Sequence, residues 1–331
     1  MITTLVLLAG LAVGEEVSLK LQLVDNQITV SGLSSGGYMA SQFHIAHSSR
    51  VVGAGIFSAG PYFCARNNLQ LALQECVSQA NAELPFEQIN QRMASWQHQG
   101  LIDPIVSLAN SRAWLFHGQL DQRVDSQLTR QLKQQYQQWL PDAQIRLVDD
   151  KAVAHLFPTQ SAGGSCEVSE SPFIGHCQFA AASEMMDFLT AEATAYPEET
   201  GQIYQFDQYQ LAGQPVRGMA QHGYLFVPEA CKAGNTCALH ISFHGCNQNA
   251  ESVGQAYVRQ TGFNEWAGQH RTVVLYPQTM ATNAPLNPQA CWDWWGYTSA
   301  AYATKEGEQI NAVAQMIEAL QRQVTVIRQA P

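Results

Sequence analysis

The residues best suited to chemistry form a G-x-S-x-G motif, Gly32-Leu33-Ser34-Ser35-Gly36, placed after a β-branched run and before an apolar periodic segment. A strand that turns sharply into a helix lifts the central serine hydroxyl above the carboxyl edge of a sheet. Glycine on both sides lets the two backbones approach closely. Ser34 has glycine at both offsets, whereas Ser35 has Leu33 on one side. We therefore predict Ser34 as a nucleophile, with a glycine-rich turn of no chemical role as the alternative.

An acid and a histidine follow later in the chain at matching positions. A serine hydroxyl becomes nucleophilic when a histidine accepts its proton, and a carboxylate fixes the tautomer of that histidine. With this motif the chain order is serine, acid, histidine. Asp121 follows a predicted strand at 113–116 and His155 follows the next one at 145–148, so both belong to the edge that carries Ser34. The competing acids are Asp125, Asp149 and Asp150, and the competing histidines are His117, His176 and His244.

A possible oxyanion loop, His244-Gly245-Cys246, comes far after His155 in the chain. In the usual arrangement the loop that supplies the second oxyanion N–H precedes the nucleophile. The observed order results if the first strands of the sheet have moved to the C-terminus. Domain termini often lie close together, so such a circular permutation can leave the core unchanged. The alternative is a strand unrelated to catalysis.

The elements that must position these residues alternate between strands and helices. Short β-branched or aromatic runs predict strands at 28–30, 51–57, 113–116, 145–148, 224–227, 238–243 and 272–276. Apolar residues at three- and four-residue spacing predict helices at 38–48, 126–140, 180–193, 253–267 and 306–321. This alternation predicts an α/β fold, with a mostly parallel sheet and helices on both faces. We expect one catalytic domain over residues 15–331, with 201–218 as the candidate surface connection.

Composition excludes several classes of function. The 331 residues are 46% hydrophobic and carry 17 Lys and Arg against 27 Asp and Glu, a net charge of −10. A sequence of this hydrophobicity folds, and its acidic balance argues against nucleic acid and anionic membranes as partners. The cysteine pairs lack the two-residue gap of a zinc knuckle. We expect no metal, no cofactor and a monomer.

The N-terminus and the cysteines indicate secretion. Residues 5–13 are an apolar run that ends in small residues, which predicts a signal peptide over residues 1–14; a buried N-terminal strand is the alternative. The eight cysteines then favour disulfides over buried thiols in a cytosolic protein. Their spacing indicates local pairs and leaves one long-range pair: Cys64–Cys76, Cys166–Cys177, Cys231–Cys237 and Cys246–Cys291. Extracellular and periplasmic residence both fit.

Several motifs in combination resemble a known family. They are Val30-Ser31-Gly32-Leu33-Ser34-Ser35-Gly36-Gly37-Tyr38-Met39-Ala40, Gly60-Pro61-Tyr62, Cys64-Ala65-Arg66, His155-Leu156-Phe157-Pro158-Thr159, His244-Gly245-Cys246 and Cys291-Trp292-Asp293-Trp294. This set resembles the extracellular poly(3-hydroxybutyrate) depolymerases, in their single-domain, circularly permuted α/β-hydrolase form. Many bacterial members add a linker and a substrate-binding domain, and many have smaller residues where this chain has Gly118-Gln119-Leu120.

The resemblance implies roles for individual residues. It implies Ser34, Asp121 and His155 as the triad, the main-chain N–H groups of Ser35 and Cys246 as the oxyanion hole, and the same four disulfides. It also implies Trp294 in the substrate crevice, where we expect Trp292 and Tyr62 as further substrate contacts.

The expected function is that of a secreted serine esterase. It would hydrolyse poly(3-hydroxybutyrate) or related polyhydroxyalkanoates to hydroxyacid oligomers and monomers through an acyl-enzyme. Two alternatives stay open at this point. One is a secreted carboxylesterase acting on feruloyl, acetyl-xylan or synthetic aryl polyester groups, and the other is a non-catalytic secreted binding protein.

Overall fold

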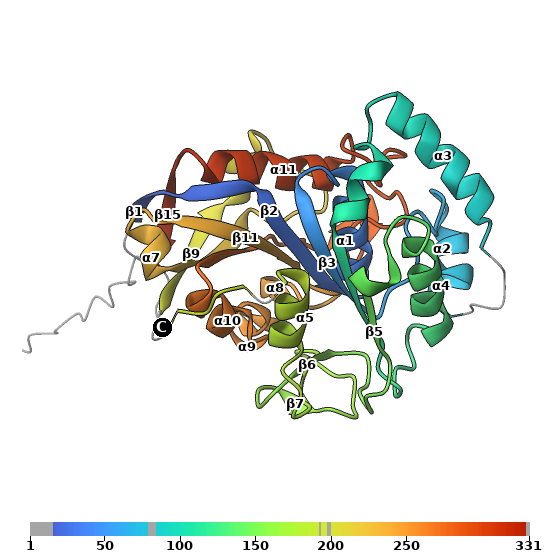
Figure 1. Ribbon diagram of the computed structural model, residues 1–331, viewed down its shortest axis with the longest axis horizontal. Helices are drawn as coiled ribbons and strands as arrows, with labels where there is room; N and C mark the ends of the chain where they lie inside the picture. Colours follow the sequence, from blue (N-terminus) through green and yellow to red (C-terminus); the bar gives the residue numbers. More distant parts are fainter. Residues whose placement is uncertain (1–15, 79–83, 192, 197–199, 329–331) are drawn as a thin grey trace, which may run out of the picture.

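A ten-stranded mixed sheet forms the centre of the molecule, with helices on both faces (Figure 1). The structure is a computed structural model that describes residues 16–78, 84–191, 193–196 and 200–328. The predicted signal peptide, 1–14, lies outside the described residues. Across the sheet the strands follow the order β1 (Glu16–Lys20), β15 (Gln323–Arg328), β9 (Gly201–Asp207), β10 (His222–Pro228), β12 (Thr272–Tyr276), β11 (Thr236–Phe243), β2 (Gln22–Leu33), β3 (Val51–Phe57), β4 (Arg112–Phe116) and β5 (Ile145–Val148).

The part of the sheet that runs from β12 to β5 is parallel. The ladder from β12 through β11, β2, β3 and β4 to β5 is parallel throughout. Antiparallel pairing is confined to the ladders that involve β10, β9, β15 and β1. All seven predicted strands are present, and the mostly parallel sheet with helices on both faces is confirmed.

The strand order is that of a circular permutation. Strands β9 to β12 come late in the chain, but in the sheet they lie on the side of β2 opposite to β3. Of these strands, β11 pairs directly with β2. Numbering the chain from β9 would make the sheet order nearly sequential. β1 and β15 pair antiparallel, so the two ends of the described chain meet at one edge of the sheet. This proximity is what a rewired α/β-hydrolase fold requires.

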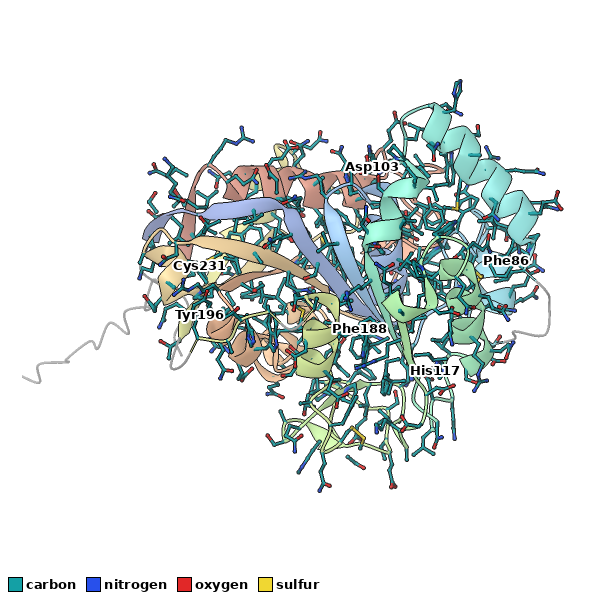
Figure 2. The ribbon with its side chains drawn as sticks, in the orientation of Figure 1. Phe86, Asp103, His117, Phe188, Tyr196 and Cys231 are labelled. Atoms are coloured by element: carbon teal, nitrogen blue, oxygen red, sulfur yellow. A yellow bond between two sulfur atoms is a disulfide. The ribbon has the colours of Figure 1, made fainter. Side chains whose placement is uncertain are left out.

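Two hydrophobic cores lie on opposite faces of the sheet. Successive strand side chains point to opposite faces; Ile56 belongs to the first core and Phe57 to the second, and Leu115 and Phe116 divide in the same way. The first core contains buried residues of α1, α4 and α11, and the second those of α5, α9 and α10. Figure 2 shows these side chains filling the space between sheet and helices. The central parallel strands β3, β4 and β12 are therefore buried along nearly their whole length, which explains their continuous apolar runs.

The helices are α1 (Ser35–Ala46), α2 (Leu69–Glu75), α3 (Phe86–His98), α4 (Ser126–Tyr136), α5 (Ala181–Leu189), α6 (Gln208–Ala212), α7 (Glu229–Lys232), α8 (Ala250–Val253), α9 (Ala256–Gln260), α10 (Phe263–Gln269) and α11 (Glu308–Leu320), with 3₁₀ turns at Ile105–Asn110 and Asp142–Gln144. The predicted helix at 253–267 is wrong as a single element. It is divided into α8, α9 and α10 because Gly254 (φ 59°) and Gly262 (φ 86°) adopt backbone angles that a helix does not allow. None of the described helices has the length and hydropathy needed to cross a membrane.

Two small sheets complete the fold. One consists of β6 (Phe157–Thr159), β8 (Ile174–His176) and β7 (Gly164–Ser165), and the other of β13 (Thr282–Asn283) and β14 (Leu286–Asn287). The first of these follows His155 directly. Its connecting loop supports the histidine, since the Ser169 hydroxyl donates to the His155 carbonyl at 2.8 Å.

Candidate active site

Ser34 lies at a strained turn between the end of β2 and the start of α1. Its φ of 58° lies in the left-handed region, which residues with a side chain rarely adopt. The flanking glycines make this turn sterically possible. A Cβ on Gly32 would lie 2.2 Å from the Gly36 carbonyl oxygen, and a Cβ on Gly36 would lie 2.2 Å from that of Phe243. The serine is thus placed at the point where β2, α1 and β11 approach most closely.

Asp121 and His155 meet across the carboxyl edge of the sheet. His155 Nδ1 lies 2.7 Å from Asp121 Oδ2. The other carboxylate oxygen, Oδ1, accepts hydrogen bonds from the backbone N–H groups of Arg123 (2.8 Å) and Val124 (3.0 Å). Burial on its own would raise the pKa of Asp121, but these hydrogen bonds and the adjacent imidazole hold that pKa at about 2. The carboxylate is therefore charged at any ordinary pH.

This arrangement fixes the role of the imidazole. A charged carboxylate accepts only from a protonated Nδ1, so His155 Nε2 carries the lone pair when the ring is neutral. His155 and Ser34 line the same pocket, which has a volume of about 250 Å³. The lone pair of a buried imidazole can accept the proton of a serine hydroxyl that shares its pocket, which is the function of a general base.

The competing acids have other partners. Asp125 caps α4 by accepting from the Gln127 N–H at 2.8 Å. Asp149 pairs with Arg130 at 3.3 Å, and Asp150 with Lys151 at 3.4 Å, both on the surface. These contacts do not bring any of the three to His155.

The competing histidines also lie elsewhere. His117 lies behind the acid, with Nε2 3.8 Å from Asp121 Oδ2 and Nδ1 2.8 Å from the Thr129 hydroxyl. A larger polar hollow of about 490 Å³ also lies on that side of Asp121, and Ser34 is not among its lining residues. His176 is exposed at the end of β8. His244 is buried in the loop after β11.

The residues expected to form the oxyanion hole, Ser35 and Cys246, both line the pocket. Ser35 is the first residue of α1, and the first N–H groups of a helix have no acceptor within the helix. Cys246 comes from the loop after β11, and both residues line the pocket with Ser34. Because β11 pairs with β2, the loop at 244–246 is held beside the turn at Ser34.

The walls of the pocket are largely apolar. The Trp294 ring stacks on Tyr38 with centroids 4.6 Å apart and an interplanar angle of 12°. Leu69 and Leu73, one turn apart on α2, also line the pocket and expose 51% and 55% of their surface. The pocket therefore joins a buried polar site to an exposed apolar rim, which suits an uncharged, water-insoluble ligand.

Comparisons with known proteins identify the family. A curated poly(3-hydroxybutyrate) depolymerase from Delftia acidovorans is 39% identical over 90% of this chain, which spans 60% of that relative's length. A polyhydroxybutyrate depolymerase from Talaromyces funiculosus is 32% identical, with 88% of this chain and 89% of the relative aligned. The chain belongs to the poly(3-hydroxybutyrate) depolymerase family. No family model matched the sequence.

Solved depolymerase structures agree with this membership. PHB depolymerase from Penicillium funiculosum superposes with a TM-score of 0.81 at 30% identity, covering 90% of this chain and 96% of that one. A serine-to-alanine variant of a PHB depolymerase complexed with an R3HB trimer gives a TM-score of 0.83, also at 30% identity, and covers 92% and 98%. The fold is thus shared with the family over almost the full length of those chains.

Two of the residues expected to contact substrate, Tyr62 and Trp292, do not line the pocket. Tyr62 exposes 0% of its surface, and its hydroxyl donates to the Ala303 carbonyl at 2.6 Å. Trp292 also exposes 0% and packs edge-on against Phe243 with centroids 5.0 Å apart. Neither lines the pocket, because both are needed in the core beneath it. Of the three expected substrate contacts, only Trp294 reaches the cavity.

Sequence reasoning missed other pocket residues. Leu69 and Leu73 lie on α2, a helix that was not predicted from the sequence, so nothing indicated that these two leucines would line the pocket. Phe173 and Gln248 also line the pocket, and neither belongs to a motif identified in the sequence, although Gln248 follows His244-Gly245-Cys246 in the same loop.

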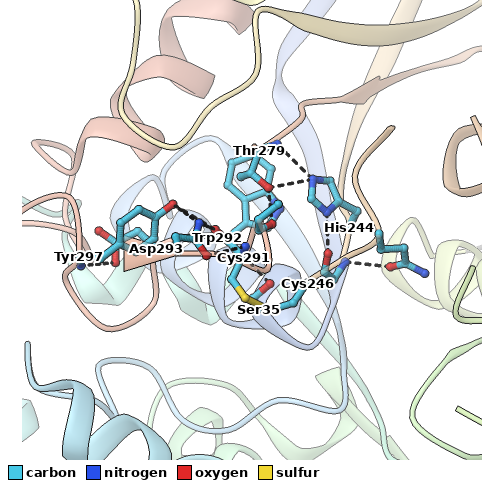
Figure 3. Close-up of a disulfide and its surroundings, with 12 residues drawn as sticks. Ser35, His244, Cys246, Thr279, Cys291, Trp292, Asp293 and Tyr297 are labelled. Carbon is cyan, nitrogen blue, oxygen red and sulfur yellow. Dashed lines mark hydrogen bonds between the residues drawn. A yellow bond between two sulfur atoms is a disulfide. The ribbon is translucent and has the colours of Figure 1, made fainter. Parts of the chain in front are cut away.

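The disulfides follow the predicted pairing. The bonds are Cys64–Cys76, Cys166–Cys177, Cys231–Cys237 and Cys246–Cys291, and no described cysteine is free. The last of these ties the candidate oxyanion loop to the segment that contains Trp292 and Trp294 (Figure 3).

Proposed function

We propose that this protein is a serine esterase that hydrolyses poly(3-hydroxybutyrate) and related polyhydroxyalkanoates to hydroxyacid oligomers and monomers. The observation that carries the proposal is the 2.7 Å contact between His155 Nδ1 and Asp121 Oδ2, in a pocket that His155 shares with Ser34. Membership of the depolymerase family supports the choice of substrate class.

The geometry supports acyl transfer in two half-reactions. Ser34 Oγ attacks the ester carbonyl carbon while His155 Nε2 accepts the hydroxyl proton. The N–H groups of Ser35 and Cys246 hold the negative charge on the carbonyl oxygen, and the alcohol end leaves with the proton from His155. Water then attacks the acyl-serine, giving its proton to His155, and Ser34 departs with that proton as the acid is released. Asp121 stabilises the imidazolium in both halves without becoming protonated.

The pocket supports a polyester rather than a charged substrate. Its exposed rim is formed by Leu69 and Leu73, and Trp294 provides a flat apolar wall. An insoluble polyester chain carries methyl groups and ester dipoles but no charges along its length. Apolar burial at the rim, at about 25 cal/mol per Å², would hold such a chain while one ester enters the site. We propose no cofactor and no partner other than the polymer, with the enzyme acting as a monomer.

Secretion completes the proposal. Four disulfides in the described residues support folding in an oxidising compartment. We propose residues 1–14 as the signal peptide and residues 15–331 as one catalytic domain.

The test is the clearing of a turbid poly(3-hydroxybutyrate) suspension, with released hydroxyacids measured by chromatography. Wild-type protein should clear the suspension, and Ser34→Ala should lose at least about 1,000-fold in rate. Ser126→Ala, on α4 outside this pocket, is the control and should clear normally. A fluorophosphonate should label the wild type at Ser34 alone. Clearing by folded Ser34→Ala at more than a tenth of the wild-type rate would refute the proposal.

A further inference from the structure

His244 contacts the peptide group that presents one of the oxyanion donors. Its Nδ1 lies 2.7 Å from the Gly245 carbonyl oxygen. Figure 3 shows the His244 ring beside the loop that carries Cys246. The Gly245 carbonyl and the Cys246 N–H belong to the same peptide group. In a trans peptide the C=O and the N–H point in opposite directions. A hydrogen bond that holds the Gly245 oxygen therefore also fixes the direction of the Cys246 N–H.

The neighbours of the imidazole determine its tautomer. His244 Nε2 lies 3.1 Å from the Thr279 backbone N–H, which can only donate. The Thr279 hydroxyl lies 3.2 Å from the same nitrogen, but its one proton goes to the Ala290 carbonyl at 2.5 Å. Nε2 is consequently an acceptor, and Nδ1 carries the hydrogen. The ring is buried, and burial lowers its pKa to about 4, so it is neutral when the esterase works.

These contacts form a closed ring of covalent and hydrogen bonds. From His244 the ring passes through Thr279 to Ala290, along the chain to Cys291, and through the disulfide to Cys246. Figure 3 shows four of its residues, His244, Thr279, Cys291 and Cys246, near Ser35. A rotation of the Gly245–Cys246 peptide would therefore break at least one hydrogen bond of this ring.

A second side chain restrains the other peptide of the loop. The Gly245 N–H donates to Gln248 Oε1 at 2.8 Å, and Gln248 Nε2 donates to the carbonyls of Pro172 and Phe173. Each of the two peptide groups that flank Gly245 is therefore held by a side-chain hydrogen bond, one with His244 and the other with Gln248. The Trp292 ring packs against the imidazole with centroids 5.6 Å apart, which accounts for its burial.

We propose that His244 is a positioning residue, whose Nδ1–H group holds the Gly245–Cys246 peptide so that the Cys246 N–H points at the developing oxyanion. The inference rests on the proposed function, because it assumes that Cys246 donates to that oxyanion. Donors fixed before the reaction need no reorganisation when charge develops. A hydrogen bond accepted by the carbonyl also polarises the peptide and makes its N–H a stronger donor.

Two substitutions test the roles of the two ring nitrogens separately. In His244→Asn the amide nitrogen can take the place of Nδ1 and still donate to the Gly245 oxygen. In His244→Gln the longer side chain places its amide near the position of Nε2, where it can accept from Thr279 but not reach Gly245. We expect His244→Gln to lose roughly 10- to 100-fold in kcat/KM on a soluble 3-hydroxybutyrate ester, a fraction of the loss of a whole oxyanion donor. His244→Asn should stay within about fivefold of wild type.

The decisive measurement compares binding of two inhibitors. An alkyl trifluoromethyl ketone forms an oxyanion when Ser34 adds to it, whereas the matching secondary alcohol binds without forming one. His244→Gln should weaken the ketone by the same factor as kcat/KM and leave the alcohol unchanged. The inference is overturned if folded His244→Gln binds the ketone as wild type does, or if folded His244→Asn loses as much as His244→Gln.

A measurement on the wild type keeps the test valid if either variant fails to fold. Nitrogen-15 NMR of labelled histidine should show the ring assigned to His244 protonated at Nδ1 and not at Nε2, with a pKa well below 6.5. Protonation at Nε2 would contradict the assignment. A wild type that neither hydrolyses the ester nor binds the ketone would refute the proposed function, whereas an active wild type with an insensitive His244→Gln variant refutes only the role of His244.

Discussion

Replacing Asp121 by asparagine should invert the tautomer of His155. Asp121 Oδ1 accepts from two backbone N–H groups, so an asparagine would keep its carbonyl oxygen at that position. Its NH₂ group would then lie 2.7 Å from His155 Nδ1, where the carboxylate oxygen was. An NH₂ group can only donate, so Nδ1 must become the acceptor and the hydrogen must move to Nε2. Nε2 then has no lone pair with which to accept the Ser34 proton.

The expected loss is about 10,000-fold in kcat, the cost of the wrong tautomer in a serine triad, or about 5 kcal/mol of barrier. KM should change little, because Asp121 does not line the substrate pocket. The assay is steady-state hydrolysis of a soluble 3-hydroxybutyrate ester. Asp125→Asn is the matched control: asparagine caps a helix as well as aspartate does, so α4 and the activity should be unaffected. If a folded Asp121→Asn enzyme kept a tenth of wild-type kcat, Asp121 would not be the acid.

Three further outcomes are expected. In Gly36→Ala the new Cβ would lie 2.2 Å from the Phe243 oxygen, so urea unfolding should show a loss of about 1–3 kcal/mol together with lost activity; an unchanged midpoint would contradict this. Cys291→Ser removes a disulfide with a sequence separation of 45 and should lower the free energy of unfolding, measured by urea titration, by about 4 kcal/mol. Cys231→Ser, which removes a disulfide with a sequence separation of only 6, should lower it by less. The free energy of unfolding should fall as pH drops from 6.5 towards 4, because histidines that are exposed in the unfolded chain bind protons in this range while the same histidines, buried in the folded protein, stay neutral. A free energy of unfolding that is constant over that range would contradict this expectation. The four histidines concerned have pKa values lowered by burial to about 3 or 4, namely His44, His47, His240 and His244.

Much of the sheet could be predicted from local sequence. The central parallel strands β3 and β12 are buried on both faces, so the runs at 51–57 and 272–276 are apolar or β-branched along their length and end near the observed bounds. Strands β1 and β15 lie at the sheet edge and have mixed exposure, so no apolar run marked them. The division of the segment 253–267 depends on glycine angles that tertiary packing selects.

In the site, too, some residues could be predicted from local sequence, whereas the place of others depends on tertiary packing. Ser34 is marked by glycines that the turn requires sterically, and Asp121 and His155 by their place after successive strands. The burial of Tyr62 and Trp292 could not be predicted, because an aromatic ring in a loop suits a core and a binding surface equally. The role inferred for His244 needed coordinates, since its partner Thr279 is 35 residues away in sequence and Ala290, which accepts from the Thr279 hydroxyl, is 46 residues away.

The pairing of β1 with β15 has a practical consequence for attaching this enzyme to a support. β1 is the edge strand of the sheet and β15 lies beside it, with Glu16 paired to Ile327, and the 12 residues of β2, roughly 40 Å of strand, separate the end of β1 from Ser34. A fusion tag or tether joined beyond either strand would leave from the same corner of the molecule, remote from the serine. An enzyme immobilised through either end should therefore keep its cavity turned towards the solution.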